Sequence, residues 1–156
     1  MIFRSILRLL PVLAVVALSA CASKPEGFTK VKIYRLDPQD RITALDPSIN
    51  FEQDHYLYGA VSNEEREARR GNYYTFFWKA NDRSQPVTLR FEYRQSVTRS
   101  AVKQQQVEIT EVKRNNITRI AVTGEDYATA GKILAWRAVL LQGGKEIASE
   151  KSFMWQ

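Results

Sequence analysis

The stretch Val87-Thr88-Leu89-Arg90-Phe91-Glu92-Tyr93-Arg94 decides the fold class. Its odd-numbered residues are apolar or aromatic, and its even-numbered residues are polar or charged. Because successive side chains of a β-strand point to opposite faces, this period of two predicts a strand with one buried and one solvated face. It is the clearest strand signal in the chain.

The same period recurs along most of the chain beyond residue 27. Short runs rich in β-branched and aromatic residues are separated by segments rich in turn-forming residues, which is typical of an all-β protein. The further predicted strands are Val31–Ile33, Tyr56–Val61, Tyr73–Ala80, Val107–Val112, Ile117–Val122, Ile133–Leu141 and Glu146–Trp155. About seven to nine antiparallel strands predict an all-β sandwich or barrel.

Turn signals suggest how some of these strands connect. Gly143-Gly144 separates the last two strands, and because glycine adopts positive φ at no steric cost, it predicts a tight hairpin. A second, weaker hairpin is predicted over Lys113–Asn116. Asp37-Pro38 and Asp46-Pro47 break the segment after the first strand, since proline pushes the preceding residue out of the helical region. That segment is therefore expected to be irregular.

One segment departs from the period of two and predicts a short surface helix over about residues 63–70. Ser62 and Glu65 have the spacing of a capping box, and Gly71 marks the stop. Two interpretations of its arginines remain open. Pairing of Glu65 with Arg69 and of Glu67 with Arg70 would make an exposed, self-neutralising helix. Alternatively, the arginines would form a claw for an anionic ligand; these are Arg66, Arg69 and Arg70.

The segment Tyr73–Ala80 is apolar on both faces. One face carries Tyr74, Phe76 and Trp78 and is predicted to lie in the core, as is Trp136 in the later strand. The opposite face carries Tyr73 and Phe77. We expect it to be covered by residues 37–54 or by the short helix. If it is left exposed, it becomes a partner-binding patch.

These features together resemble the immunoglobulin and fibronectin-III-like sandwiches. The resemblance implies that Trp78 is the buried tryptophan of the third strand. It also implies that Tyr127, in Gly124-Glu125-Asp126-Tyr127, is the tyrosine of a tyrosine corner, which favours a sandwich over a closed barrel. The fold class expected is thus an antiparallel immunoglobulin-like β-sandwich.

The amino terminus has the pattern of a removable export signal. Arg4 and Arg8 precede an apolar run over residues 9–18, which is about half the length needed to cross a bilayer and contains Pro11. The run ends in Leu18-Ser19-Ala20-Cys21, which resembles the lipobox of bacterial lipoproteins. That resemblance implies cleavage before Cys21 and a diacylglycerol on its thiol. Ala22 and Ser23 follow instead of aspartate, which by the lipoprotein sorting rule implies the outer membrane, facing the periplasm.

The expected organisation is a signal peptide over 1–20, a lipidated tether over 21–27 and a single β-sandwich domain over 28–156. The net charge of +6 falls to +4 without the leader, an excess too small to indicate a nucleic-acid partner for an exported protein. The sole cysteine excludes an intramolecular disulfide. Near the tether, Lys24, Lys30, Lys32 and Arg35 are either a solvated edge or a contact with phospholipid.

Signals of catalytic chemistry are missing from the sequence. His55 is the sole histidine and Cys21 is assigned to lipid, so neither a zinc site nor a histidine-activated nucleophile can be assembled. His55 is expected to make a structural hydrogen bond at the start of a strand. The seven glycines form no phosphate-binding loop. We therefore expect no catalytic residue, no metal, no cofactor and no enzymatic activity.

Two function classes remain. The first is a protein-interaction or envelope-assembly module that offers an aromatic face or strand edge to a partner. The second is a carbohydrate- or peptidoglycan-binding module that stacks sugars on exposed aromatics such as Tyr73, Phe77 or Trp155. A coplanar row of solvent-facing rings flanked by acids or amides would favour the glycan. A continuous apolar patch or bare edge strand would favour the protein partner.

Overall fold

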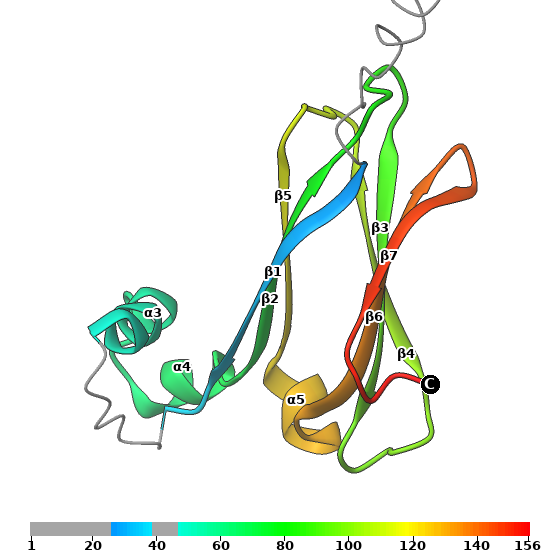
Figure 1. Ribbon diagram of the computed structural model, residues 1–156. Coiled ribbons are helices and arrows are strands. Elements are labelled where there is room, and N and C mark those ends of the chain that lie inside the picture. Colours follow the sequence, from blue (N-terminus) through cyan, green and yellow to red (C-terminus); the bar gives the residue numbers. More distant parts are fainter. Residues whose placement is uncertain (1–25, 39–46) are drawn as a thin grey trace, which may run out of the picture.

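The computed structural model describes residues 26–38 and 47–156. Within these ranges the chain forms seven strands in two antiparallel sheets, together with three helices (Figure 1). The predicted signal peptide (1–20), Cys21 and the tether up to residue 25, including Lys24, lie outside the described residues.

One sheet has three strands and the other has four. The first sheet has the order β1-β2-β5, with bounds Gly27–Leu36, Gly71–Lys79 and Asn116–Thr123. The second has the order β4-β3-β6-β7, with bounds Lys103–Ile109, Val87–Gln95, Ile133–Gln142 and Lys145–Lys151. The sheets lie face to face (Figure 1), in agreement with the predicted all-β sandwich.

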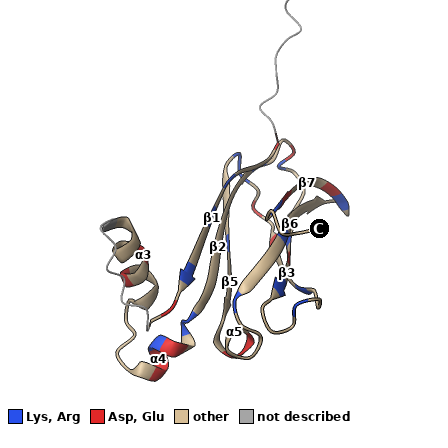
Figure 2. Cartoon of the chain, turned by 60° about the horizontal axis from the view of Figure 1, so that its bottom comes forward, with Lys and Arg blue, Asp and Glu red and all other residues tan. Residues whose placement is uncertain are grey.

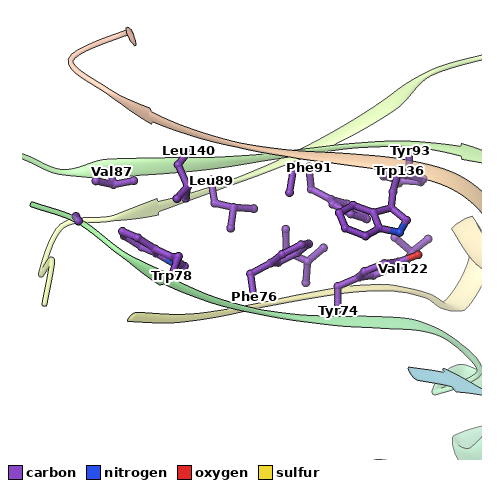
Figure 3. Packing of buried hydrophobic residues seen from close by; sticks show 13 residues of the cluster. Tyr74, Phe76, Trp78, Val87, Leu89, Phe91, Tyr93, Val122, Trp136 and Leu140 are labelled. Atoms are coloured by element: carbon purple, nitrogen blue, oxygen red, sulfur yellow. The ribbon is translucent and has the colours of Figure 1, made fainter. Parts of the chain in front are cut away.

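The core fills the space between the two sheets. From β2 it takes Tyr74, Phe76 and Trp78, and opposite them lie side chains of β3 and β6 (Figure 3). Trp78 is 1% exposed and Trp136 is 7% exposed, so their predicted core positions are confirmed. The Trp78 indole Nε1 donates a 3.0 Å hydrogen bond to Thr118 Oγ1, which satisfies its buried donor. Trp78 lies on the second strand, however, and not on the third strand that the resemblance implied.

The stretch Val87–Arg94 lies in strand β3, as its alternation predicts. In β3 the odd-numbered residues from Val87 to Tyr93 are buried and the even-numbered ones are half-buried. β3 pairs with both β4 and β6, which places it inside its sheet. The Gly143-Gly144 hairpin between β6 and β7 is also confirmed, with φ angles of 55° and 78°.

The predicted hairpin over Lys113–Asn116 is wrong. β4 pairs with β3 in one sheet, whereas β5 pairs with β2 in the other, so this connection crosses from sheet to sheet. The Asn116 side chain instead organises the crossing: its Oδ1 accepts from the Lys113 backbone N at 2.8 Å, and its Nδ2 donates to the Lys113 O at 2.6 Å. These two hydrogen bonds run from Asn116 back to the residue three positions earlier and hold the crossing in place.

The predicted strand Tyr56–Val61 is also wrong. Helix α3, Pro47–Leu57, occupies its beginning, and Gly59 (φ 79°) lies in the turn that follows. Pro47 is the first residue of this helix, a position where the missing N–H costs nothing and the fixed φ suits the helix. Pro47 therefore marks the start of a helix, whereas residues 39–46 of the segment predicted to be irregular lie outside the described residues.

The predicted surface helix is confirmed as α4, Asn63–Ala68, with the Ser62–Glu65 capping box formed in both directions. It is not the only helix: besides α3, helix α5 (Gly124–Ala130) connects β5 to β6. Tyr127 lies in α5 and is buried. The last strand is shorter than predicted, since it ends at Lys151 and a turn over residues 152–155 follows.

Candidate functional site

The candidate site lies on the outer face of the three-stranded sheet. Strand pairing places side chains there in rows that run across β1, β2 and β5. One row contains Tyr34 and Tyr73. The next row is Lys32, Thr75 and Arg119, with Thr75 in the middle. Because a row joins residues directly opposite one another, the members of each row are side-chain neighbours.

Helix α3 covers one end of this face and leaves a hollow beside it. The Tyr56 ring stacks on the Tyr73 ring, with centroids 4.0 Å apart, and on the Tyr34 ring at 5.2 Å. The remaining space, which we call the outer cleft, has a volume of about 680 Å³. It is lined by Lys32, Ile33, Tyr34, Arg35, Ser48, Ile49, Phe51, Glu52, His55, Tyr56, Tyr73, Thr75, Phe77 and Arg119.

Arg69 attaches α3 to the sandwich. Its Nη1 donates to the backbone carbonyl oxygens of Tyr56, at 3.2 Å, and Tyr58, at the carboxyl end of α3. These carbonyls have no partner within the helix, so a cationic donor is favourable there. The Arg69 backbone carbonyl in turn accepts a hydrogen bond from the Tyr73 hydroxyl on β2. One arginine therefore connects the helix to the sheet that it covers.

The floor of the outer cleft combines hydroxyl groups with cations. Burial and the nearby Glu52 carboxylate raise the pKa of Tyr56, while Arg119 and a hydrogen bond with Thr75 act in the opposite direction. Burial, with Glu52 next, raises the pKa of Tyr34 as well. Both tyrosines are therefore neutral near pH 7 and can donate hydrogen bonds. The Tyr34 hydroxyl is buried and has no hydrogen-bond partner within the described residues.

The structure separates the aromatic residues proposed for sugar stacking. Tyr73 and Phe77 both line the outer cleft, but Tyr56 lies over the Tyr73 ring. Trp155 is not part of the cleft; the Arg94 guanidinium lies 4.9 Å from its ring centroid. The three residues therefore do not form one coplanar row.

His55 is on helix α3, so its predicted place at the start of a strand is wrong. Its ring stacks on Phe51 at 6.4 Å and meets the Tyr56 ring edge-on at 5.4 Å. Tyr34, Tyr56 and Arg119 line the outer cleft, although no sequence pattern indicated them as site residues. An (i, i+4) pairing of Glu52 with Tyr56 would have been a usable signal if residues 47–57 had been predicted as a helix.

Arg69 and Arg70, which follow α4, have other partners, so the anion-binding claw of Arg66, Arg69 and Arg70 considered from the sequence does not form. Arg69 points to the end of α3. Arg70 pairs with Asp37 at 2.9 Å and with Glu67 at 3.6 Å, which confirms the predicted Glu67–Arg70 pair. The Glu65 carboxylate is used mainly in the capping box, where it accepts from the Ser62 and Val61 backbone N–H groups.

The cations expected near the tether lie along β1. Lys30, Lys32 and Arg35 belong to this strand, and the latter two line the outer cleft. β1 begins at Gly27, the last residue of the predicted tether, and runs toward α3 and α4 (Figures 1 and 2). At about 3.3 Å per residue, Lys32 and Arg35 lie roughly 15–25 Å along the strand from Gly27.

Residues 26–38 and 47–156 contain no cluster of three or more His, Cys, Asp or Glu side chains suited to a metal ion. In the same ranges no helix combines the length and apolar character needed to span a membrane. Comparison of the chain with protein-family models, curated proteins and solved structures finds no match.

Proposed function

We propose that the sandwich is of the immunoglobulin-like, fibronectin-III-type class. Naming the seven strands A, B, C, C′, E, F and G in chain order gives sheets ABE and C′CFG, a division in which the chain changes sheets between C′ and E. Tyr127 supports this assignment, because it is buried in the connection between the strands named E and F. Trp78 departs from the immunoglobulin pattern of a buried tryptophan on strand C, since it lies on strand B.

We propose further that the protein is an outer-membrane lipoprotein facing the periplasm, anchored through Cys21 and a tether over 21–27. The lipobox-like Leu18-Ser19-Ala20-Cys21 and the following Ala22 support this. Two or three acyl chains make membrane release negligible, since each buried methylene contributes about 0.8 kcal/mol. Cys21→Ser is expected to leave the precursor unprocessed at the inner membrane. An unmodified Cys21 in the mature wild-type protein, found by mass spectrometry, would contradict the assignment.

We propose that this tethered domain is a non-catalytic protein-interaction module of the envelope. The observation that carries the proposal is the outer cleft, whose apolar rim is left open beside α3. Ile33, Ile49 and Phe51 are 53%, 40% and 69% exposed, and apolar side chains gathered at a concave site are typical of a binding surface. The carbohydrate alternative is less well supported, because the tyrosine rings stack on one another and cations outnumber acids around them.

Site-specific photo-crosslinking in intact cells tests this function. A photoreactive phenylalanine analogue replaces Phe51, at the outer cleft, or Phe153, which is fully exposed near the carboxyl terminus. We expect a discrete protein adduct from position 51 and none from position 153. Absence of an adduct at both positions, equal adducts at both, or an adduct at position 51 that a peptidoglycan hydrolase releases would contradict a protein-binding cleft.

A further inference from the structure

Two cations flank a threonine on the floor of the outer cleft. Lys32 and Arg119 are both opposite Thr75, one on each neighbouring strand, and both are exposed. With strands about 4.8 Å apart, their Cα atoms are separated by about 10 Å. Long cationic side chains at this separation can both reach one anionic group placed over Thr75.

Neutral hydrogen-bond donors lie beside the same position. The Tyr56 hydroxyl interacts with Thr75 and with the Arg119 charge, and Tyr56 lies directly over Tyr73. Hydroxyl donors and two cations form a suitable environment for a carboxylate. Glu52 is the one acidic residue among those that line the cleft, so a ligand that brings a further anion meets a net positive surface.

The apolar part of the cleft adjoins this polar floor. Ile49 and Phe51 are on α3 and line the same hollow as Thr75 and Arg119. A ligand that fills the cleft must therefore carry an anionic group and an apolar group close together. An extended peptide does this well, because neighbouring or alternate side chains can be acidic and apolar.

We propose, on the basis of the protein-binding function above, that the outer cleft binds an extended acidic and apolar segment of a partner protein. An acidic side chain lies between Lys32 and Arg119, and an apolar side chain packs on Ile49 and Phe51. The position of Lys32 favours a protein over lipid headgroups, since it lies five residues along β1 from Gly27, where the predicted tether ends.

A peptide probe with a charge-reversed control tests the chemistry. The probes are a blocked hexapeptide with two glutamate–leucine pairs between glycines and its lysine–leucine counterpart. The wild-type domain is expected to bind the acidic peptide at least about five-fold more tightly. K32E/R119E should weaken that binding about ten-fold, while K145E/K151E, which changes net charge equally on β7, should weaken it less than about two-fold.

Three results would overturn the proposal: no preference for the acidic peptide, equal losses in the two variants, or stronger K32- and R119-dependent binding to phosphatidylglycerol vesicles than to the peptide. Combining the charge reversal with crosslinking at position 51 in cells separates this proposal from the one it rests on. If the wild type forms the adduct and K32E/R119E retains it, the acidic partner is rejected and the protein-binding function stands. If the wild type forms no adduct at position 51, both the acidic-partner proposal and the protein-binding function are rejected.

Discussion

Strand β2 has two aromatic faces that differ in burial. Its inner face carries Tyr74, Phe76 and Trp78, which are at most 3% exposed. Its outer face carries Tyr73 and Phe77, which are only half-buried. The two sets are interleaved residue by residue and have similar composition. What distinguishes them is the element that covers each face.

The inner face is covered by a whole sheet and the outer face by one helix. Phe76 lies against Phe91 and Trp136 with ring centroids 5.7 and 5.8 Å away, and both neighbours are on the opposing sheet. Tyr73 is covered by Tyr56 of α3, a helix attached through Arg69. A sheet closes the space completely, whereas one helix leaves a cleft. The covering element therefore decides whether an aromatic face becomes core or binding site.

The largest expected effect is on the inner face. Trp78→Ala should lower the free energy of unfolding by about 3–5 kcal/mol, because it leaves a cavity and removes the hydrogen bond to Thr118. That is a large fraction of the stability of an ordinary domain. Urea denaturation followed by circular dichroism measures it. Trp155→Ala is the matched control: the ring is half-buried outside the core and packs on Arg94, so its loss should cost only about 1 kcal/mol. Equal costs would contradict the core assignment.

An intermediate effect is expected on the outer face. Tyr56→Ala should cost about 1–2 kcal/mol, because it removes ring stacking on Tyr34 and Tyr73 but leaves the sandwich core intact. Amide hydrogen exchange should quicken in α3 and remain slow in β3 and β6. If exchange quickens equally throughout, α3 belongs to the cooperative core, and the distinction between the two faces of β2 fails.

The inner face was predictable from sequence, and the outer cleft was only partly so. Alternation located β3 and the core face of β2, because burial between two sheets requires a strict period of two. The same alternation places Tyr73 and Phe77 on the outer face. The covering helix is not predicted by the sequence pattern, because Pro47 indicates a break and Tyr56–Val61 has the composition of a short strand. Strand pairing in the first sheet brings Arg119 to Lys32 from 87 residues away, which no local pattern indicates.

The tyrosine hydroxyls of the core side and of the cleft side differ in their hydrogen-bond partners. Tyr93, on the core side of β3, donates to Asp126 Oδ2 at 2.9 Å, and Lys103 pairs with the other oxygen of that carboxylate. Partial burial would raise the pKa of Asp126, but the hydrogen bonds from Lys103 and Tyr93 outweigh it and lower the pKa. Burial and the bond to Asp126 raise the pKa of Tyr93 to about 12. The Tyr34 hydroxyl, on the cleft side, has no such carboxylate partner within the described residues.

Asp126→Asn should therefore cost about 1 kcal/mol at pH 7, a modest figure because the carboxylate side chain is 38% exposed. Since the folded pKa is below the unfolded value of about 3.9, this stabilisation is present above that pH and is lost as the pH falls through the folded pKa. Urea titrations of both proteins at pH 7 and at pH 3 should show the difference shrinking. A difference that is constant with pH would contradict the ionic network.

The smallest expected effect concerns α4, the helix that immediately precedes Arg69 and thus the attachment of α3. Ser62→Ala removes the side-chain oxygen that accepts from the Glu65 N–H at 3.1 Å, and should cost about 0.5 kcal/mol, since α4 is short and exposed. Its consequence should extend to α3, because Arg69 follows directly after α4 and donates to the end of α3. Amide exchange in α3 is therefore expected to quicken slightly.

Thr123→Val is the matched control, because Thr123 occupies the same N-cap position of α5 without a side-chain capping bond. If both variants leave amide exchange in α3 unchanged, α4 does not help to attach α3, and Arg69 acts independently of the helix that precedes it.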